Sequence, residues 1–209
     1  VSRGLGDVYK RQYVKDAKTG EYHPLTGNMS GSLLCDYVLG QKQAKGQIPA
    51  DGQVIKSIVT TNLVNAVAEH YGCELVEVLT GFKYIGQQIL NFETTGKGTY
   101  LFGFEESYGC LIGTHARDKD AIVAVMALCE AAAYYKSKGI TLWDQMINIF
   151  DKYGYFKEGQ KAVTMKGAEG AVQIAKMMDD LRNNPPNKFG AWNVVEFRDY
   201  KKDECTVIA

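Results

Sequence analysis

Residues 54–104 read VIKSIVTTNLVNAVAEHYGCELVEVLTGFKYIGQQILNFETTGKGTYLFGF, and this stretch decides the fold. It alternates short runs of β-branched and apolar residues with longer segments whose apolar residues recur at helical spacing. Strands that alternate with helices imply right-handed crossovers and a mostly parallel sheet with helices on its faces. The stretch therefore predicts an α/β fold of three layers, α/β/α. The expected strands are Val54–Thr60, Glu74–Leu79 and Thr99–Phe104, and the expected helices are Leu63–Tyr71 and Phe82–Leu90.

Each of the three expected strands is followed by a small polar cluster. The clusters are Thr60-Thr61-Asn62, Thr80-Gly81 and Glu105-Glu106-Ser107. In open α/β sheets, ligands bind in the crevice outside the carboxyl ends of the strands. We therefore expect the three clusters to surround one crevice. The alternative is that these residues only cap the following helices, with Asn62 as an N-cap, and both roles can hold together.

The loop after the third strand, Gly103–Ala121, reads GFEESYGCLIGTHARDKDA and is rich in groups that bind ligands. A carboxylate beside a hydroxyl, as in Glu105 and Ser107, is suited to neighbouring hydroxyl groups of a sugar. The basic residues His115, Arg117 and Lys119 are spaced by two and are suited to an anion such as phosphate. The pattern favours a loop that binds a sugar phosphate. The alternative is that these charged side chains simply face water.

The composition describes an ordinary globular protein of 209 residues, with 45% hydrophobic and 23% charged residues. Lys plus Arg and Asp plus Glu both total 24, so no bulk charge favours nucleic acid or an anionic membrane. The longest apolar run, Ala121–Cys129, is far shorter than the roughly 20 residues of a membrane span. Five cysteines without CxxC spacing favour reduced thiols in the cytosol over a disulfide framework or a zinc site.

The rest of the chain predicts further helices and strands around this unit. A polar segment rich in glycine, Gln41–Gln53, predicts a linker. Thr141 and Asp144 form the pattern of a capping box at the start of a helix that Gly154 ends. The other expected elements are helices at Ser30–Leu39, Lys119–Lys138, Thr141–Tyr153 and Ala168–Leu181, and strands at Lys161–Met165 and Trp192–Phe197.

The first twelve residues, VSRGLGDVYKRQ, differ from the rest of the chain and resemble a translated library adapter. They carry no stable apolar period. We expect Val1–Gln12 to be a leader that is foreign to the fold.

Two motifs carry a resemblance to a known family: TGFKYIG at Thr80–Gly86, and FEESYG through RDKDA at Phe104–Ala121. Together with KTGEYHPLTGN near the start, they resemble the α-D-phosphohexomutases, the phosphoglucomutase and phosphomannomutase family. The resemblance covers about Tyr13–Tyr200. It implies the end of domain two at 13–45, the sugar-binding domain three at 46–157 and the start of domain four at 158–209, so the flanking domains are partial.

Members of this family move a phosphoryl group between two hydroxyls of a hexose. A phosphoserine in domain one donates it, a hexose 1,6-bisphosphate is the intermediate, and Mg²⁺ held by domain two neutralises charge. The resemblance implies that Thr80, Gly81, Glu105 and Ser107 bind the sugar. It also implies that His115, Arg117 and Lys119 face the phosphates and that Lys119 transfers a proton at a sugar hydroxyl. Lys83 lies inside the TGFKYIG motif and remains open as a site residue.

The serine, metal and terminal phosphate loops of the family have no counterpart in these 209 residues. We therefore expect a fragment that lacks domain one and most of domains two and four and that is inactive alone. The FEESYG sequence is closer to phosphoglucomutases and related phosphopentomutases than to the GEMSGH type of phosphomannomutases. Phosphoglucomutase is the first expectation. The alternatives are a phosphopentomutase or a non-catalytic module that binds sugar phosphates. A nucleotide-binding domain would need a glycine-rich turn after the first strand, where Thr60-Thr61-Asn62 stands.

Overall fold

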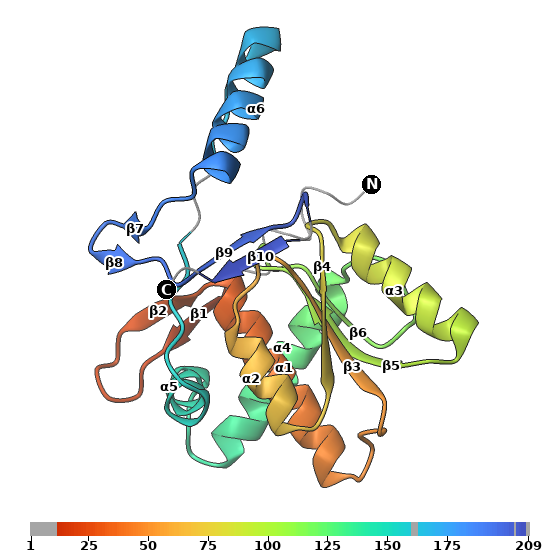
Figure 1. Cartoon of the computed structure of the whole chain (residues 1–209). Helices are drawn as coiled ribbons and strands as arrows, with labels where there is room; N and C mark the ends of the chain where they lie inside the picture. The colour runs from red at the N-terminus through yellow and green to blue at the C-terminus, as the bar shows by residue number, and fades with distance from the viewer. Residues whose placement is uncertain (1–11, 160–162, 203, 208–209) are drawn as a thin grey trace. The chain divides into compact units, whose positions relative to one another are not determined.

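The computed structural model describes residues 12–159, 163–202 and 204–207 (Figure 1). The chain divides into two compact units, Val1–Glu158 and Gly159–Ala209. The expected leader, Val1–Gln12, lies outside the described residues except for Gln12, which begins the first strand.

The first unit is built on a four-stranded sheet in the order β4-β3-β5-β6. The strands β3 (Gly52–Ser57), β4 (Glu74–Val78) and β5 (Thr99–Phe104) are parallel, with β3 in the middle. This confirms the mostly parallel sheet. A short fourth strand that the sequence did not predict, β6 (Cys110–Ile112), pairs antiparallel with β5. The polar stretch after β5 is therefore a hairpin followed by a loop.

Helices cover both faces of this sheet, which confirms the three layers. One face packs against α3 (Phe82–Thr95), which inserts Phe82, Ile85 and Ile89 over Ile55 of β3. Val54, the neighbour of Ile55, belongs to the core on the other face because successive strand residues point to opposite sides. Four helices contribute to that second core: α1 (Gly27–Ala44), α2 (Leu63–His70), α4 (Ala121–Ser137) and α5 (Leu142–Tyr153).

The helix termini follow the expected signals in most places. Thr141 and Asp144 form the predicted capping box of α5, and Gly139 and Gly154 follow α4 and α5 with φ of 79° and 102°. The helix α4 starts at Ala121 rather than at Lys119, because the Asp120 side chain accepts hydrogen bonds from the backbone N–H groups of residues 122 and 123. Asn62 occupies the predicted N-cap position of α2, but its side chain makes no capping hydrogen bond.

The segment before β3 is more ordered than the sequence indicates. A hairpin of β1 (Gln12–Lys15) and β2 (Tyr22–Leu25) leads into α1, which runs to Ala44. The predicted linker Gln41–Gln53 is therefore reduced to the residues between Ala44 and Gly52. Because α1 shares its core with α2, α4 and α5, the first unit extends to the N-terminal side of residue 46.

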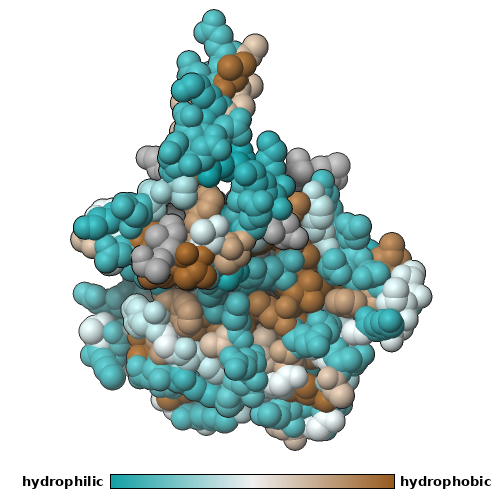
Figure 2. Space-filling model, viewed as in Figure 1, coloured by the Kyte–Doolittle hydropathy of each residue, from teal (hydrophilic) through white to brown (hydrophobic). Residues whose placement is uncertain are grey.

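The described residues of the second unit form one helix, α6 (Gly167–Asn183), and two hairpins of short strands. Residues 163–165 of the predicted strand Lys161–Met165 are not a strand, and residues 161 and 162 lie outside the described residues. The predicted strand Trp192–Phe197 is interrupted between β8 and β9. Figure 2 shows hydrophilic residues over most of the visible side of α6, with hydrophobic ones along an edge. The hairpin strands are β7 (Lys188–Phe189), β8 (Trp192–Asn193), β9 (Glu196–Asp199) and β10 (Glu204–Val207).

Among the described helices, none combines the length and the apolar character that crossing a membrane requires.

Candidate functional site

The ends of the three parallel strands are joined by hydrogen bonds, so the three polar clusters do lie together. The backbone N–H of Gly81, after β4, donates to Oε1 of Glu105, after β5, at 2.7 Å. Glu106 links β5 to β3, because its Oε2 accepts from the Ser57 hydroxyl at 3.2 Å and from the Thr60 hydroxyl at 3.4 Å. The sheet order explains why these loops meet: β3 lies between β4 and β5, and because the three strands are parallel, their carboxyl ends lie at the same edge of the sheet.

Glu105 is buried at this edge, with 6% of its surface exposed. Burial raises the pKa of the Glu105 carboxyl, and the hydrogen bond from Gly81 opposes that rise. Gly81 has a φ of 123°, in a region that strongly favours glycine, and this conformation directs its N–H toward Glu105. One carboxylate oxygen of Glu105 is thus held by Gly81, and no described residue donates a hydrogen bond to the other.

Lys119 lies beside Glu105, and Gly109 makes this approach possible. A Cβ atom on Gly109 would stand 2.9 Å from Cδ of Lys119 and 3.4 Å from Oε2 of Glu105. The nearby positive charge of Lys119 lowers the pKa of Glu105, in opposition to the dominant effect of burial. The Lys119 side chain is exposed, and its Nζ lies 3.2 Å from Oδ1 of Asp118. The stem of Lys119 and the carboxylate of Glu105 therefore lie on either side of Gly109 at the edge of the sheet.

The other two basic residues of the loop are directed to different partners. Nε2 of His115 lies 3.1 Å from Oδ2 of Asp120, and this hydrogen bond lowers the pKa of Asp120. Arg117 forms an ion pair with Glu93 of α3 and donates to the carbonyl oxygen of Thr114 at 2.7 Å. The structure thus brings Lys119 to Glu105, while His115 and Arg117 are engaged with carboxylates away from the strand ends.

The remaining candidate residues are exposed, Thr80 and Ser107 on loops and Lys83 on a helix. Thr80 follows β4, and Ser107 lies in the turn of the β5–β6 hairpin. Lys83 is exposed in the first turn of α3, and its Nζ lies 4.9 Å from the centre of the Tyr84 ring. No described residue accepts a hydrogen bond from the hydroxyl groups of Thr80 or Ser107, so both are available to a ligand.

The β5–β6 loop (residues 105–109) has its shape fixed by the start of α1. A Cβ atom on Gly27 would stand 1.8 Å from the carbonyl oxygen of Glu106, so only glycine permits this contact. Tyr108 adopts a φ of 69°, which is rare for a residue with a side chain, and its hydroxyl donates to the carbonyl oxygen of Leu25. The sequence did not indicate that residues 25–27 shape this loop.

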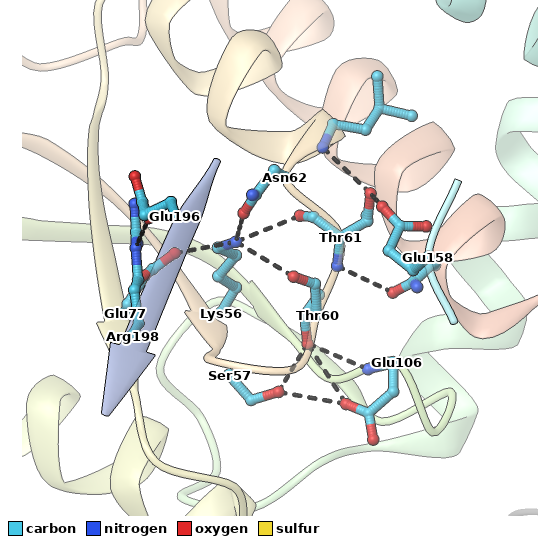
Figure 3. A network of polar contacts seen from close by, with 12 residues as sticks. Lys56, Ser57, Thr60, Thr61, Asn62, Glu77, Glu106, Glu158, Glu196 and Arg198 are labelled. Carbon is cyan, nitrogen blue, oxygen red and sulfur yellow. Dashed lines mark hydrogen bonds and ion pairs between the residues drawn. The ribbon is translucent and has the colours of Figure 1, made fainter. Parts of the chain in front are cut away.

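Lys56 and Glu106 were not predicted as site residues, yet both are central to the polar network in Figure 3. Lys56 is fully buried, and its Nζ contacts oxygens of residues 60, 61 and 62 and of Glu77. A lysine within the otherwise apolar run of β3 was the available signal, because a buried ammonium requires partners.

A groove of about 390 Å³ opens beside the end of β3. Its lining combines the polar residues Thr26, Asn28 and Thr61 with the aromatic rings of Trp143 and Phe156. Such a lining suits a polar ligand with some apolar surface.

Within the described residues, no three His, Cys, Asp or Glu side chains lie close enough together to hold a metal ion.

Comparison with known proteins identifies the family. The family model described as phosphoglucomutase/phosphomannomutase, alpha/beta/alpha domain III, matches residues 26–153. The phosphoglucomutase of Staphylococcus haemolyticus is 32% identical over 195 residues, which is 93% of this chain and 34% of that protein. That of Staphylococcus aureus strain MRSA252 is 34% identical over 179 residues, which is 85% of this chain and 31% of that protein. The chain thus spans about a third of the length of these relatives.

Solved structures share the fold. The exocytosis-sensitive phosphoprotein pp63/parafusin (phosphoglucomutase) of Paramecium, in its open form, aligns with a TM-score of 0.53 and 19% identity, over 88% of this chain and 31% of that one. A phosphoglucomutase/phosphomannomutase family protein of Burkholderia thailandensis aligns with a TM-score of 0.53 and 15% identity, over 86% of this chain and 32% of that one. The family model covers more than half of the chain, and the fold agrees with it. The chain therefore belongs to the phosphoglucomutase/phosphomannomutase family and contains its α/β/α domain III.

Proposed function

We propose that this chain is the sugar-selecting part of a phosphohexomutase that interconverts hexose 1-phosphate and hexose 6-phosphate, with glucose as the preferred sugar. The observation that carries the proposal is the position of Glu105. It joins two of the expected substrate loops through Gly81, and Lys119 stands beside it. A buried carboxylate with one oxygen that no described residue engages is suited to accept hydrogen bonds from sugar hydroxyls, and such charge-assisted bonds are strong.

In this proposal, Glu105 and Ser107 orient the sugar, and Thr80 and Gly81 line the same crevice. Lys119 faces the phosphoryl group or the reacting hydroxyl and transfers the proton there. Its ammonium can balance negative charge that develops on the transferred group. His115 and Arg117 contribute positive charge to the phosphate side once a ligand competes with Asp120 and Glu93.

The rest of the chemistry belongs to parts of the protein beyond these residues. The phosphoserine, the Mg²⁺ site and the clamp for the non-reacting phosphate are expected in domains one, two and four of the same protein. Mg²⁺ would neutralise charge at the phosphoserine, and hexose 1,6-bisphosphate would be the intermediate. We place this enzyme in the cytoplasm, in agreement with five free cysteines among the described residues.

The test is to express the complete reading frame that carries this segment and to measure conversion of glucose 1-phosphate to glucose 6-phosphate. Mannose 1-phosphate and a pentose 1-phosphate are assayed beside it. Fastest turnover of glucose 1-phosphate is the expected result, and the 209-residue chain alone should show none. Fastest turnover of the pentose phosphate would identify a phosphopentomutase instead. Binding without turnover would identify a non-catalytic module, and neither binding nor turnover would refute the proposal.

A further inference from the structure

Lys56 is a fully buried lysine near the carboxyl end of the central strand β3. The preceding residue, Ile55, packs under α3, so Lys56 points to the opposite face of the sheet, where α2 begins. Its Nζ lies 3.0 Å from Oε1 of Glu77, the residue beside it in register on β4. An ammonium at such a position is tolerated only when oxygen atoms surround it.

The same ammonium holds the loop that connects β3 to α2. Its Nζ donates to the carbonyl oxygen of Thr60 at 3.1 Å, to that of Thr61 at 3.4 Å and to Oδ1 of Asn62 at 2.6 Å (Figure 3). These contacts involve three consecutive residues, so they fix the path of the backbone as well as one side chain. Lys56 therefore fixes the conformation of the loop between β3 and α2.

The contact with Lys56 also sets the orientation of the Asn62 amide. An ammonium has donors and no acceptor, so the oxygen of the amide must face it and the nitrogen must face away. Asn62 is exposed and its side chain does not cap α2. Within the described part of the chain, no acceptor lies within hydrogen-bond distance of its Nδ2. Two N–H donors are thus presented at the edge of the sheet that carries Gly81 and Glu105.

We propose that Asn62 is a substrate-binding residue whose amide N–H groups donate to an oxygen of the phosphosugar, and that Lys56 is the positioning residue that aims this amide. The inference rests on the proposed function and adds a residue to the crevice. Phosphate and hydroxyl oxygens both accept such hydrogen bonds. A neutral donor in a fixed orientation contributes the same contact at every pH.

The central variant is Asn62→Asp, made in the complete protein. The new carboxylate still accepts from Lys56, so the loop keeps its support, but the two N–H donors are replaced by acceptors. Asn91→Asp on α3 is the matched control, because Asn91 is exposed and its side chain makes no described contact. Calorimetric titration with glucose 1-phosphate should show a Kd raised about tenfold or more in Asn62→Asp and unchanged in Asn91→Asp. An unchanged Kd in Asn62→Asp would overturn the inference.

Lys56→Met tests the positioning role, because methionine fills the space of the lysine stem without the ammonium. If Lys56 acts through Asn62, the double variant Lys56→Met/Asn62→Asp should bind no more weakly than Asn62→Asp alone. Additive losses, or wild-type binding by a folded Lys56→Met, would refute the positioning role. Should Lys56→Met fail to fold, the result for Asn62→Asp decides the binding role.

Two further arms separate the outcomes. Titration with inorganic phosphate identifies the oxygen: weaker binding of phosphate by Asn62→Asp assigns a phosphate oxygen, and an effect on glucose 1-phosphate alone assigns a hydroxyl. Glu105→Gln is measured in parallel. Weaker binding by Glu105→Gln with wild-type binding by Asn62→Asp refutes this inference and leaves the proposed function standing. A wild-type protein that binds no phosphosugar refutes both.

Discussion

The backbone N–H of Gly81 donates a 2.7 Å hydrogen bond to Oε1 of Glu105, and this single contact ties the end of β4 to the end of β5 across the central strand. It requires the positive φ of Gly81, which no ordinary side chain adopts without strain. The glycine of the TGFKYIG motif is thus needed to orient the carboxylate of the FEESYG motif. Two motifs that lie 24 residues apart in the sequence form one structural feature.

Glu105→Gln in the complete enzyme keeps the shape of the side chain and removes its charge. The hydrogen bonds to the sugar should weaken, and kcat/KM for glucose 1-phosphate should fall ten- to a thousandfold, from about 1.5–4 kcal/mol of lost interaction. The measurement is mutase activity, with a thermal melt to show that the variant is folded. A folded variant with wild-type activity would show that this carboxylate does not hold the substrate.

Glu105 should also make stability depend on pH. Burial raises the pKa of its carboxyl above the value in the unfolded chain. The folded chain therefore binds the proton more tightly, so this contribution to stability is fully present below the unfolded pKa, about 4.3 for Glu, and is lost as the pH rises through the folded pKa. The difference in melting temperature between the wild-type chain and Glu105→Gln should shift in favour of the variant between about pH 4 and neutrality. A difference that stays constant over this range would contradict the raised pKa.

The ionised form of Glu105 accepts the stronger, charge-assisted hydrogen bonds, so substrate affinity should have the opposite pH dependence. Binding of glucose 1-phosphate by the complete enzyme should strengthen as the pH rises through the pKa of Glu105. The second phosphate ionisation, with a pKa of about 6, contributes its own dependence, so the comparison with Glu105→Gln is required. Identical profiles for the two proteins would exclude Glu105 as the source.

Lys119→Ala should weaken substrate binding, because the positive charge of Lys119 acts on Glu105 and its side chain lies beside that carboxylate. If long-range attraction is its main role, the loss should be smaller at 1 M salt, where the Debye length is about 3 Å, than at 0.1 M, where it is about 10 Å. His115→Ala is the comparison, because His115 is engaged with Asp120 and its loss should lower affinity less than the loss of Lys119 does. Wild-type affinity in a folded Lys119→Ala at both salt concentrations would remove Lys119 from the site.

Gly86→Ala should disturb the basic segment from a distance. A Cβ atom at this position would stand 2.4 Å from the carbonyl oxygen of Arg117, so the loop that carries Arg117 must move away from α3. We expect the free energy of unfolding of the chain to fall by about 1–3 kcal/mol, the usual effect of overpacking. Gly159→Ala is the matched control, because a Cβ atom there meets no neighbour within 4 Å. Urea unfolding measures both, and equal midpoints would refute the tight contact.

Much of the fold could be predicted because local patterns and tertiary contacts agree there. The strand Thr99–Phe104 was predicted residue for residue, since a run of apolar residues before a polar loop has few alternatives in an α/β protein. The strand β6 could not be predicted. It has three residues, and the turn before it uses Tyr108 at positive φ where glycine is the usual signal. Its pairing with β5 depends on that unusual turn.

The candidate site shows a similar limit. The convergence of the strand ends follows from topology and could be predicted, but the partners of individual side chains could not. Asn62 has the sequence pattern of an N-cap, yet its side-chain oxygen accepts a hydrogen bond from the buried ammonium of Lys56 instead of from the first backbone N–H groups of α2. Arg117 belongs by sequence to a group of three basic residues, but in the structure its guanidinium forms an ion pair with Glu93 of α3. These outcomes depend on which charges become neighbours after folding, and sequence spacing does not contain that information.

The contacts that fix the β5–β6 loop affect the entropy of ligand binding. Gly81, Thr60, Gly27 and Leu25 each contact this loop from a different element, so its conformational freedom is lost during folding. Ligand binding then carries little further ordering entropy, which favours affinity and selectivity. A loop of this kind is a rigid template. In the proposed reaction, the bisphosphorylated sugar must present each end in turn, so the sugar reorients while the template stays in place.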